Sequence, residues 1–193
     1  IMLPFSRAQE SEADRIGLRT LPVAEEYGGI GADVLTTTMV VEALARADQG
    51  IAVTLMQNYK LIRFLQRAGN ADQKSRFIKK IVDNPRCVMS IGSSEPDRAS
   101  DFMIPYDHPS TRYQTKAERV QGGWRINGTK VFISHAAHAG LFFLVASIDL
   151  AKKHKGVTAF LVDPRASEGI TIGAFPMRTL KRDNVAEVHF KDV

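Results

Sequence analysis

The spacing of hydrophobic residues changes near Pro85, from the period of a helix to the period of strands. Before that point, apolar residues recur every three or four positions. Asp33 is a typical helix N-cap residue, so we predict a helix from there to about Asp48. Its apolar residues lie on most of its faces, which predicts that this helix is buried between other elements.

Two more helices are predicted before the change of period. Gly50 is expected to end the first helix, and the apolar stripe from Ile51 to Ala68 predicts a second one. Asn70 is a candidate cap for a third helix, which would run to about Val82.

After Pro85 the apolar runs are short and are bounded by glycine and other turn residues. Gly122-Gly123 and Asn127-Gly128 are expected to form tight turns, because Asn-Gly is a strong hairpin signal. The predicted strands cover residues 87–93, 115–120, 124–126, 130–134, 141–147, 157–162, 170–172 and 187–190. Helices followed by strands predict an α+β fold or two domains, with the boundary near Pro85.

Composition and charge narrow the possible classes of protein. Hydrophobic residues make up 44% of the chain and charged residues 24%, which is typical of a soluble globular protein. No stretch is long and apolar enough to span a membrane, and no signal segment is visible. The net charge of +5 is spread over separate clusters without interleaved aromatic residues, so we expect no nucleic-acid partner.

The single cysteine, Cys87, excludes an internal disulfide framework and indicates a reducing compartment, either the cytoplasm or the mitochondrial matrix. It is expected to be a small buried residue on a strand. Glu95, Asp97 and Asp101 form a carboxylate-rich stretch, but no second group at suitable spacing supports a metal site or an acid/base pair. We therefore predict no metal site. Trp124 is assigned to the core.

Two stretches carry the candidate chemistry. Residues 92–101 follow an apolar strand and contain hydroxyl groups and small residues. This composition suits a large planar ligand that lies close to backbone N–H groups. In the second stretch, residues 126–134, the two-residue period of a strand places Lys130, Phe132 and Ser134 on one face. Taken singly, Phe132 is more typical of a core, Ser94 of a turn and Ser134 of a strand end.

These stretches resemble sequence motifs of acyl-CoA dehydrogenases. Ser94-Glu-Pro-Asp-Arg-Ala-Ser-Asp101 resembles the family signature Thr-Glu-Pro-x-Ala-Gly-Ser-Asp. Ile126-Asn-Gly-Thr-Lys-Val-Phe-Ile-Ser134 resembles its Asn-Gly-x-Lys-x-Trp/Phe-Ile-Thr/Ser hairpin. Further matches in the family's order are residues 21–31 before these two stretches, and residues 156–163 and 186–193 after them.

The resemblance implies an N-terminal helical domain, residues 1–85 with its start trimmed, and a flavin-facing middle β-barrel domain, residues 86–193. A C-terminal four-helix domain is expected to be absent from this sequence. FAD is the implied cofactor. Backbone groups of Ser93 and the hydroxyl of Ser94 would meet the pyrimidine edge of the flavin. Phe132 would pack on the ring face, Ser134 would lie near flavin N5, and Ser100 would contact the acyl-CoA substrate.

The implied reaction is α,β-dehydrogenation of an acyl-CoA thioester. The resemblance places the general base, usually a glutamate, in the C-terminal domain, so no catalytic residue is assigned here. Electron-transferring flavoprotein or a similar acceptor is the implied partner, and a homotetramer or homodimer is the implied assembly.

Three departures from the family pattern keep other functions open. Ala99 replaces a glycine, the loop from Met103 to Gln114 is longer than usual, and Ser134-His-Ala-Ala-His138 replaces an Asn-Gly turn. A polar group such as His135 beside Ser134 is also compatible with a flavin monooxygenase on the same fold, although a turn role is the simpler interpretation. A non-catalytic homologue that binds flavin or coenzyme A is the third possibility.

Overall fold

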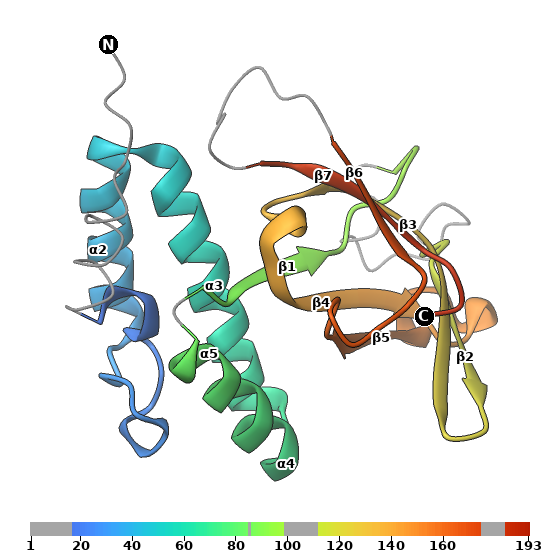
Figure 1. Ribbon diagram of the computed structural model, residues 1–193, viewed down its shortest axis with the longest axis horizontal. Coiled ribbons are helices and arrows are strands. Elements are labelled where there is room, and N and C mark those ends of the chain that lie inside the picture. The colour runs from blue at the N-terminus through green and yellow to red at the C-terminus, as the bar shows by residue number, and fades with distance from the viewer. Residues whose placement is uncertain (1–16, 85, 99–111, 175–183) are drawn as a thin grey trace. The chain divides into compact units, whose positions relative to one another are not determined.

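The computed structural model describes residues 17–84, 86–98, 112–174 and 184–193 (Figure 1). The chain divides into two compact units, Ile1–Cys87 and Val88–Val193, called unit 1 and unit 2 below. Unit 1 is helical in its described part and unit 2 is built from strands. This confirms the predicted order of a helical domain followed by a curled β domain.

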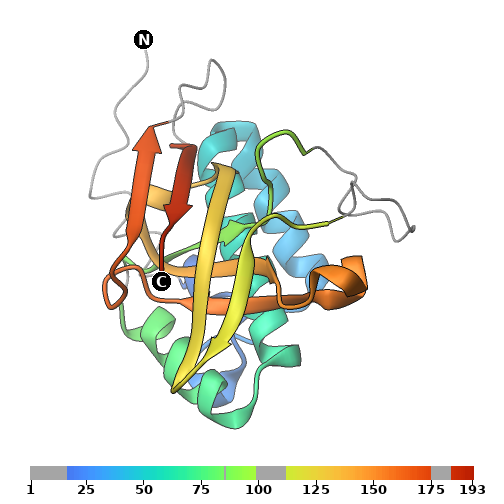
Figure 2. The ribbon, with the colours of Figure 1, turned by 90° about the vertical axis from the view of Figure 1, so that its right-hand side faces the viewer.

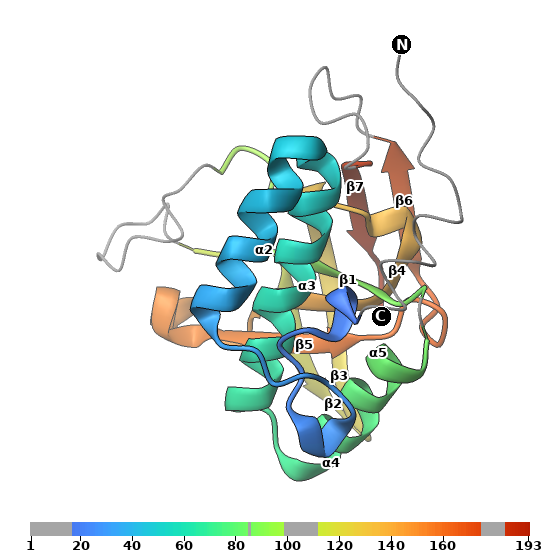
Figure 3. The ribbon, with the colours of Figure 1, turned by 90° about the vertical axis from the view of Figure 1, so that its left-hand side faces the viewer.

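Unit 1 contains two long helices that lie side by side, α2 and α3 (Figure 3). A shorter helical stretch follows them, with a π-helical turn in its middle. The described helical elements of unit 1 are η1 (Leu18–Thr20), η2 (Glu25–Tyr27), α2 (Val34–Ala47), α3 (Gln49–Ala68), α4 (Ala71–Gln73), η3 (Lys74–Ile78) and α5 (Lys79–Asp83).

Short polar side chains set the helix boundaries. Asp33 accepts a hydrogen bond from the Thr36 backbone N–H at 2.7 Å and begins α2, as predicted. Asp48 both ends α2 and caps α3, because its carboxylate accepts from the N–H groups of Gly50 (2.9 Å) and Ile51 (3.2 Å). The prediction that Gly50 breaks the helix is therefore wrong, since Gly50 lies in the first turn of α3.

The prediction that α2 is buried is also wrong. Val34, Leu35 and Met39 are 63%, 67% and 61% exposed, and Thr37 is its one buried residue. Among the described elements of unit 1, this helix packs mainly on α3. The third predicted helix is confirmed, because Asn70 forms a capping box with Gln73.

The connector before α2 is fixed by a row of polar side chains on α3. The Tyr59 hydroxyl donates to the Leu18 carbonyl, and Arg63 donates to Ala32 O at 2.8 Å. The Gln66 amide accepts from Ala24 N at 2.8 Å and donates to Pro22 O at 3.0 Å. Residues 59, 63 and 66 share one helix face, so a single face of α3 satisfies several backbone groups of the loop.

Unit 2 is a curled sheet of seven strands within the described residues. The strand order is β1-β4-β2-β3-β7-β6, and β5 pairs with β4. Figure 2 shows β2 and β3 as a long yellow hairpin beside the orange and red strands β6 and β7. The strands are β1 (Val88–Gly92), β2 (Lys116–Val120), β3 (Gly123–Ile133), β4 (Ala139–Ser147), β5 (Val157–Val162), β6 (Ile170–Ala174) and β7 (Ala186–Phe190).

Strand β3 corrects the prediction of a tight turn at Asn127-Gly128. The hairpin turn lies at Gln121-Gly122, and β3 runs unbroken through Asn127-Gly128. Here the strand changes partner, from β2 up to Asn127 to β7 from Gly128 onward. Gly128 allows this close passage, since a Cβ atom there would lie 2.6 Å from the Thr115 Cα. The strands predicted at residues 124–126 and 130–134 are thus parts of one continuous strand.

The core of unit 2 lies inside the curl of the sheet. Phe142 and Phe190 meet edge to face with ring centroids 6.1 Å apart, and both are almost fully buried. Trp124 is partly buried at the edge of this core and packs on Phe160. Cys87, the last residue of unit 1, is 1% exposed, which confirms the prediction that it is buried.

Candidate functional site

The two stretches singled out by sequence lie against each other at the ends of β1 and β3. The Ser90 hydroxyl donates to the Ser134 carbonyl at 2.7 Å, and the Val131 N–H donates to the Ser94 carbonyl at 3.0 Å. The turn after β1 is therefore bonded to the end of β3. Long-range contacts of this kind bring Ser93 and Ser94 next to the segment that contains Phe132 and Ser134.

Phe132 occupies a bulge near the end of β3. The register of β3 with β7 shifts between Lys130 and Ile133, and Phe132 has a φ angle of 58°. Its ring is 54% exposed, whereas Ile133 is 1% exposed. A left-handed conformation costs a residue with a side chain on the order of 1–2 kcal/mol, so the fold holds an exposed aromatic ring in a strained position.

This bulge overturns the prediction that Lys130, Phe132 and Ser134 share one face. The extra residue breaks the two-residue alternation. Lys130 points inward and is 0% exposed, next to Val131, which is also buried. The aliphatic part of Lys130 passes over Gly92, where an added Cβ atom would lie 3.4 Å from the Lys130 Cγ.

The buried lysine pairs with Glu95 from the first stretch. Nζ of Lys130 lies 2.8 Å from Oε1 of Glu95, and the two side chains are 0% and 2% exposed. The Glu95 carboxylate also accepts from the N–H groups of Gln114 at 2.6 Å and Thr115 at 2.9 Å. One carboxylate thereby connects the turn after β1, strand β3 and the segment before β2.

The electrostatics of the pair follow from burial and mutual charge. Burial by itself would raise the pKa of the Glu95 carboxyl, but the Lys130 charge and the bonds from residues 114 and 115 hold this pKa below its usual value. Burial lowers the pKa of Lys130 to about 8, although Glu95 acts in the opposite direction. Glu95 is thus held as the carboxylate, with the lysine ammonium as its partner at neutral pH.

Tyr113 completes this arrangement. The Lys130 Nζ lies 4.5 Å from the Tyr113 ring centroid, and it also donates to the Ser93 carbonyl at 3.3 Å. The Tyr113 hydroxyl oxygen lies 3.1 Å from the Ser93 Oγ. Burial raises the pKa of Tyr113, which is 7% exposed, so its hydroxyl stays protonated. The hydroxyl and the carbonyl of Ser93 are therefore both held by buried side chains.

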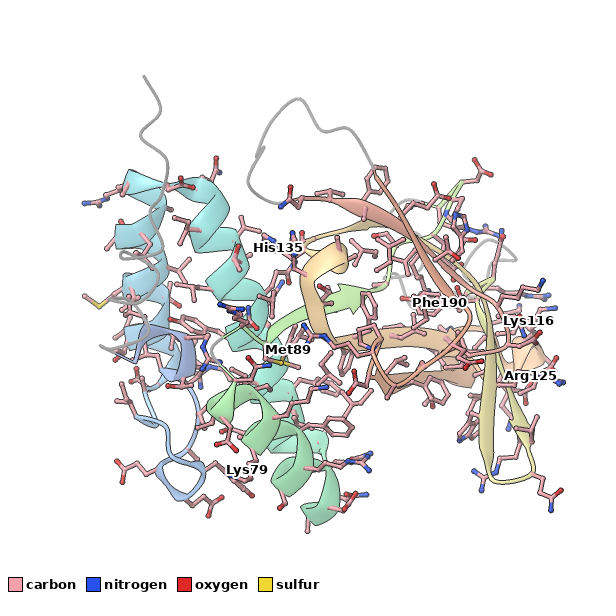
Figure 4. All side chains as sticks on the ribbon, viewed as in Figure 1. Lys79, Met89, Lys116, Arg125, His135 and Phe190 are labelled. Carbon is pink, nitrogen blue, oxygen red and sulfur yellow. The ribbon has the colours of Figure 1, made fainter. Side chains whose placement is uncertain are left out.

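His135, which is labelled in Figure 4, follows Ser134 and is the N-cap residue of the short helix η6 (Ala136–His138). Its φ angle is 57° and its side chain is 7% exposed, whereas His138 is exposed. A left-handed residue at the start of a helical turn supports the prediction of a turn role for His135.

The structure brings together four of the predicted site residues: Ser93, Ser94, Phe132 and Ser134. Ser100, Ala99, Asp101 and residues 103–111 lie outside the described residues. Sequence reasoning missed roles for Glu95, Tyr113 and Lys130. The available signal was a charged residue in each of the two stretches, Glu95 in the first and Lys130 in the second.

The described residues fit a planar aromatic ligand. Phe132 offers an exposed ring, and Ser93 and Ser94 are half-buried hydroxyl residues beside it. No group of His, Cys, Asp or Glu within the described ranges has the arrangement of a metal site. In the same part of the chain, no helix has both the length and the apolar character needed to cross a bilayer.

Comparison with known proteins adds independent evidence. The short/branched chain specific acyl-CoA dehydrogenase, mitochondrial, of Bos taurus is 33% identical over 158 residues, a match that covers 81% of this chain and 34% of the relative. The structure of butyryl-CoA dehydrogenase from Megasphaera elsdenii matches with a TM-score of 0.85 and 27% identity, covering 98% of this chain and 48% of that one. PigA with FAD and proline matches with a TM-score of 0.83 and 26% identity, covering 97% and 48%.

The chain thus spans about a third of the length of the curated relatives it matches, as the 34% coverage shows. The model of the acyl-CoA dehydrogenase N-terminal domain matches residues 4–85. The model of the acyl-CoA dehydrogenase middle domain matches residues 90–193, more than half of the chain. With the helical unit, the curled sheet and both sequence motifs in place, the chain belongs to the acyl-CoA dehydrogenase family.

Proposed function

We propose that this chain forms the N-terminal and middle portion of an FAD-dependent acyl-CoA dehydrogenase, an oxidoreductase that introduces an α,β double bond into an acyl-CoA thioester. The observation that carries the proposal is the exposed Phe132 ring, held in a strained bulge beside the Ser93-Ser94 turn. Family membership and the FAD named for the PigA structure support it.

In this proposal the four clustered residues hold the flavin. Ser93 and Ser94 bond the polar edge of the ring system, Phe132 packs on its face, and the Ser134 hydroxyl lies close to N5. Ser100 is proposed as a contact to the acyl-CoA. Residues 1–85 form the helical domain and residues 86–193 the flavin-facing domain.

Bound FAD would accept the hydride that leaves the β-carbon of the thioester. The residues of this chain would bind and orient the flavin and the thioester. The turn after β1, which is hydrogen-bonded to β3, would present hydroxyl and N–H groups to the polar edge of the flavin, and Phe132 would exclude water from one ring face. We assign no general base to the described residues, and Glu95, the carboxylate next to Ser94, is committed to Lys130 and to two backbone N–H groups.

Partners and compartment are part of the proposal. An electron-transferring flavoprotein or a similar acceptor would reoxidise the flavin, and the assembly would be a homotetramer or homodimer. We place the protein in the cytoplasm or the mitochondrial matrix. The bovine relative, which is named as a mitochondrial enzyme, and the single cysteine of this sequence support a reducing compartment.

The test uses the full-length protein that contains this chain. It is expected to purify with FAD, and anaerobic addition of a suitable acyl-CoA is expected to bleach the flavin absorption. Ser134→Ala should slow bleaching more than it weakens FAD retention. Ser147→Ala is the matched control, because that hydroxyl bonds Gly156 at the far end of β4.

Two results would contradict the proposal. A protein without flavin, which gains none on reconstitution, would exclude a flavoenzyme. A flavoprotein that no acyl-CoA reduces, across a wide range of chain lengths and branching, would not be a dehydrogenase. Oxygen-dependent turnover by such a protein would favour the monooxygenase alternative.

A further inference from the structure

We propose that Tyr113 is a positioning residue for the ligand-binding turn, and that it acts by fixing the Ser93 hydroxyl and thereby the geometry in which this turn meets its ligand. The inference rests on the proposed function, since it names a residue that prepares the proposed flavin site. Tyr113 lies at the end of a loop whose sequence carries no family motif.

Tyr113 contacts two residues of the candidate site. Its hydroxyl meets the Ser93 Oγ at 3.1 Å, and its ring lies against the Lys130 ammonium at 4.5 Å. Lys130 in turn donates to the Ser93 carbonyl at 3.3 Å and pairs with Glu95. Both the side chain and the backbone of Ser93 are thereby held by groups that are themselves buried.

This arrangement has a chemical consequence for Ser93. A serine hydroxyl rotates freely unless a partner fixes it, and it has one proton to donate. The contact at 3.1 Å between the Tyr113 hydroxyl and the Ser93 Oγ supplies such a partner, and either oxygen can be the donor. A half-buried Ser93 held in this way keeps its hydroxyl in one orientation relative to the backbone of the turn.

Stability alone gives a weak reason for such a network. A buried ion pair is often no more stabilising than apolar residues of the same volume. The polar groups of Ser93, Glu95, Tyr113 and Lys130 meet at one turn, and a requirement to hold that turn in one geometry explains this better. Groups that are held in place before binding raise affinity, because less ordering remains to be done when the ligand binds.

The experiment compares two tyrosines in the full-length protein. FAD is removed, and the apoprotein is titrated with FAD while flavin fluorescence is recorded. Tyr113→Phe keeps the ring and removes the hydroxyl that bonds Ser93, so FAD affinity should fall about fivefold, the change expected for one typical hydrogen bond. Tyr59→Phe is the control, because its hydroxyl bonds Leu18 within unit 1.

Thermal unfolding of each apoprotein separates positioning from a general loss of structure. Tyr59→Phe should lower the melting temperature without changing FAD affinity. Tyr113→Phe should lower FAD affinity, with a loss of melting temperature no larger than that of Tyr59→Phe, and it should also shift the visible absorption bands of the bound flavin.

A double-mutant cycle with Ser93→Ala tests the route of action. If Tyr113 acts through the Ser93 hydroxyl, Tyr113→Phe should have no further effect on affinity once Ser93 is alanine. Wild-type affinity in Tyr113→Phe, or fully additive losses in the double variant, would overturn the inference while the proposed function stands. If the wild-type protein binds no FAD, the proposed function itself fails, and the inference falls with it.

Discussion

The ammonium nitrogen of Lys130 lies 2.8 Å from a carboxylate oxygen of Glu95, and neither side chain is accessible to solvent. The two residues are 35 positions apart in the sequence. Their pairing joins the end of β3 to the turn after β1, and these two segments carry the proposed flavin contacts. The pair therefore connects the stability of unit 2 to the geometry of its candidate site.

Removal of one partner should destabilise the protein strongly. Glu95→Ala leaves Lys130 buried without its counter-charge, so the free energy of unfolding should fall by about 3–5 kcal/mol. Urea unfolding measures this change. Glu118→Ala is the control, because the Glu118–Arg125 pair is exposed and is worth about 1 kcal/mol or less. Equal losses in the two variants would mean that burial of the Glu95 pair has no special cost.

The same pair predicts a pH dependence of stability. The pKa of Glu95 is held below its ordinary value of 4.5 in the folded protein, so its contribution is complete above that pH and is lost as the pH falls through the folded value. The destabilisation caused by Glu95→Gln should therefore be largest near pH 7 and should shrink as the pH falls below 4.5 and through the folded pKa of Glu95. Urea midpoints of the two proteins measured from pH 7 downward test this, and a difference that stays constant until both proteins unfold would contradict it.

The strained bulge at Phe132 predicts that glycine is better tolerated than alanine. Glycine adopts a φ angle of 58° without cost, so Phe132→Gly should be more stable than Phe132→Ala by about 1 kcal/mol. Both variants should lose FAD affinity in the full-length protein, because both lack the ring.

Phe64 provides the matched control for this comparison. It is 48% exposed, similar to Phe132, but lies within helix α3. There glycine should be less stable than alanine by about 1 kcal/mol, the opposite sign. The same order of stability at both positions would show that the backbone of Phe132 is not strained.

Gly128 should tolerate no side chain. A Cβ atom at this position would lie 2.6 Å from the Thr115 Cα, and the backbone itself has a φ angle of 152°. Gly128→Ala should lower the free energy of unfolding by about 1–3 kcal/mol, as overpacking does. Gly123→Ala is the control, because no atom lies within 4 Å of a Cβ atom added there. Thermal unfolding of the two variants distinguishes them, and similar melting temperatures would contradict the close approach.

Much of the fold was predictable because its signals are local. The caps at Asp33 and Asn70 act on N–H groups within three residues, so the sequence shows where α2 and the third helical stretch begin. Alternation and turn residues likewise locate most strands of unit 2. The family motifs gave the four clustered site residues, since they occur in a fixed order along the chain.

The remaining features depend on partners far away in the sequence. Asn127-Gly128 looks like a turn, but Asn127 forms hydrogen bonds to Asp192 and Gly128 passes closely over Thr115. The apolar residues of α2 predicted burial, but exposure depends on which elements surround a helix, and among the described elements α2 packs mainly on α3.

The sequence by itself determined the family, the α+β order and the residue types of the site. Only the tertiary structure decided the bulge that exposes Phe132 and buries Lys130, and the network that links Ser93, Glu95, Tyr113 and Lys130. The physical reason is that a helix cap or a strand period is set by neighbours in sequence. A bulge, a buried charge and its partner are set by segments that meet only when the sheet closes.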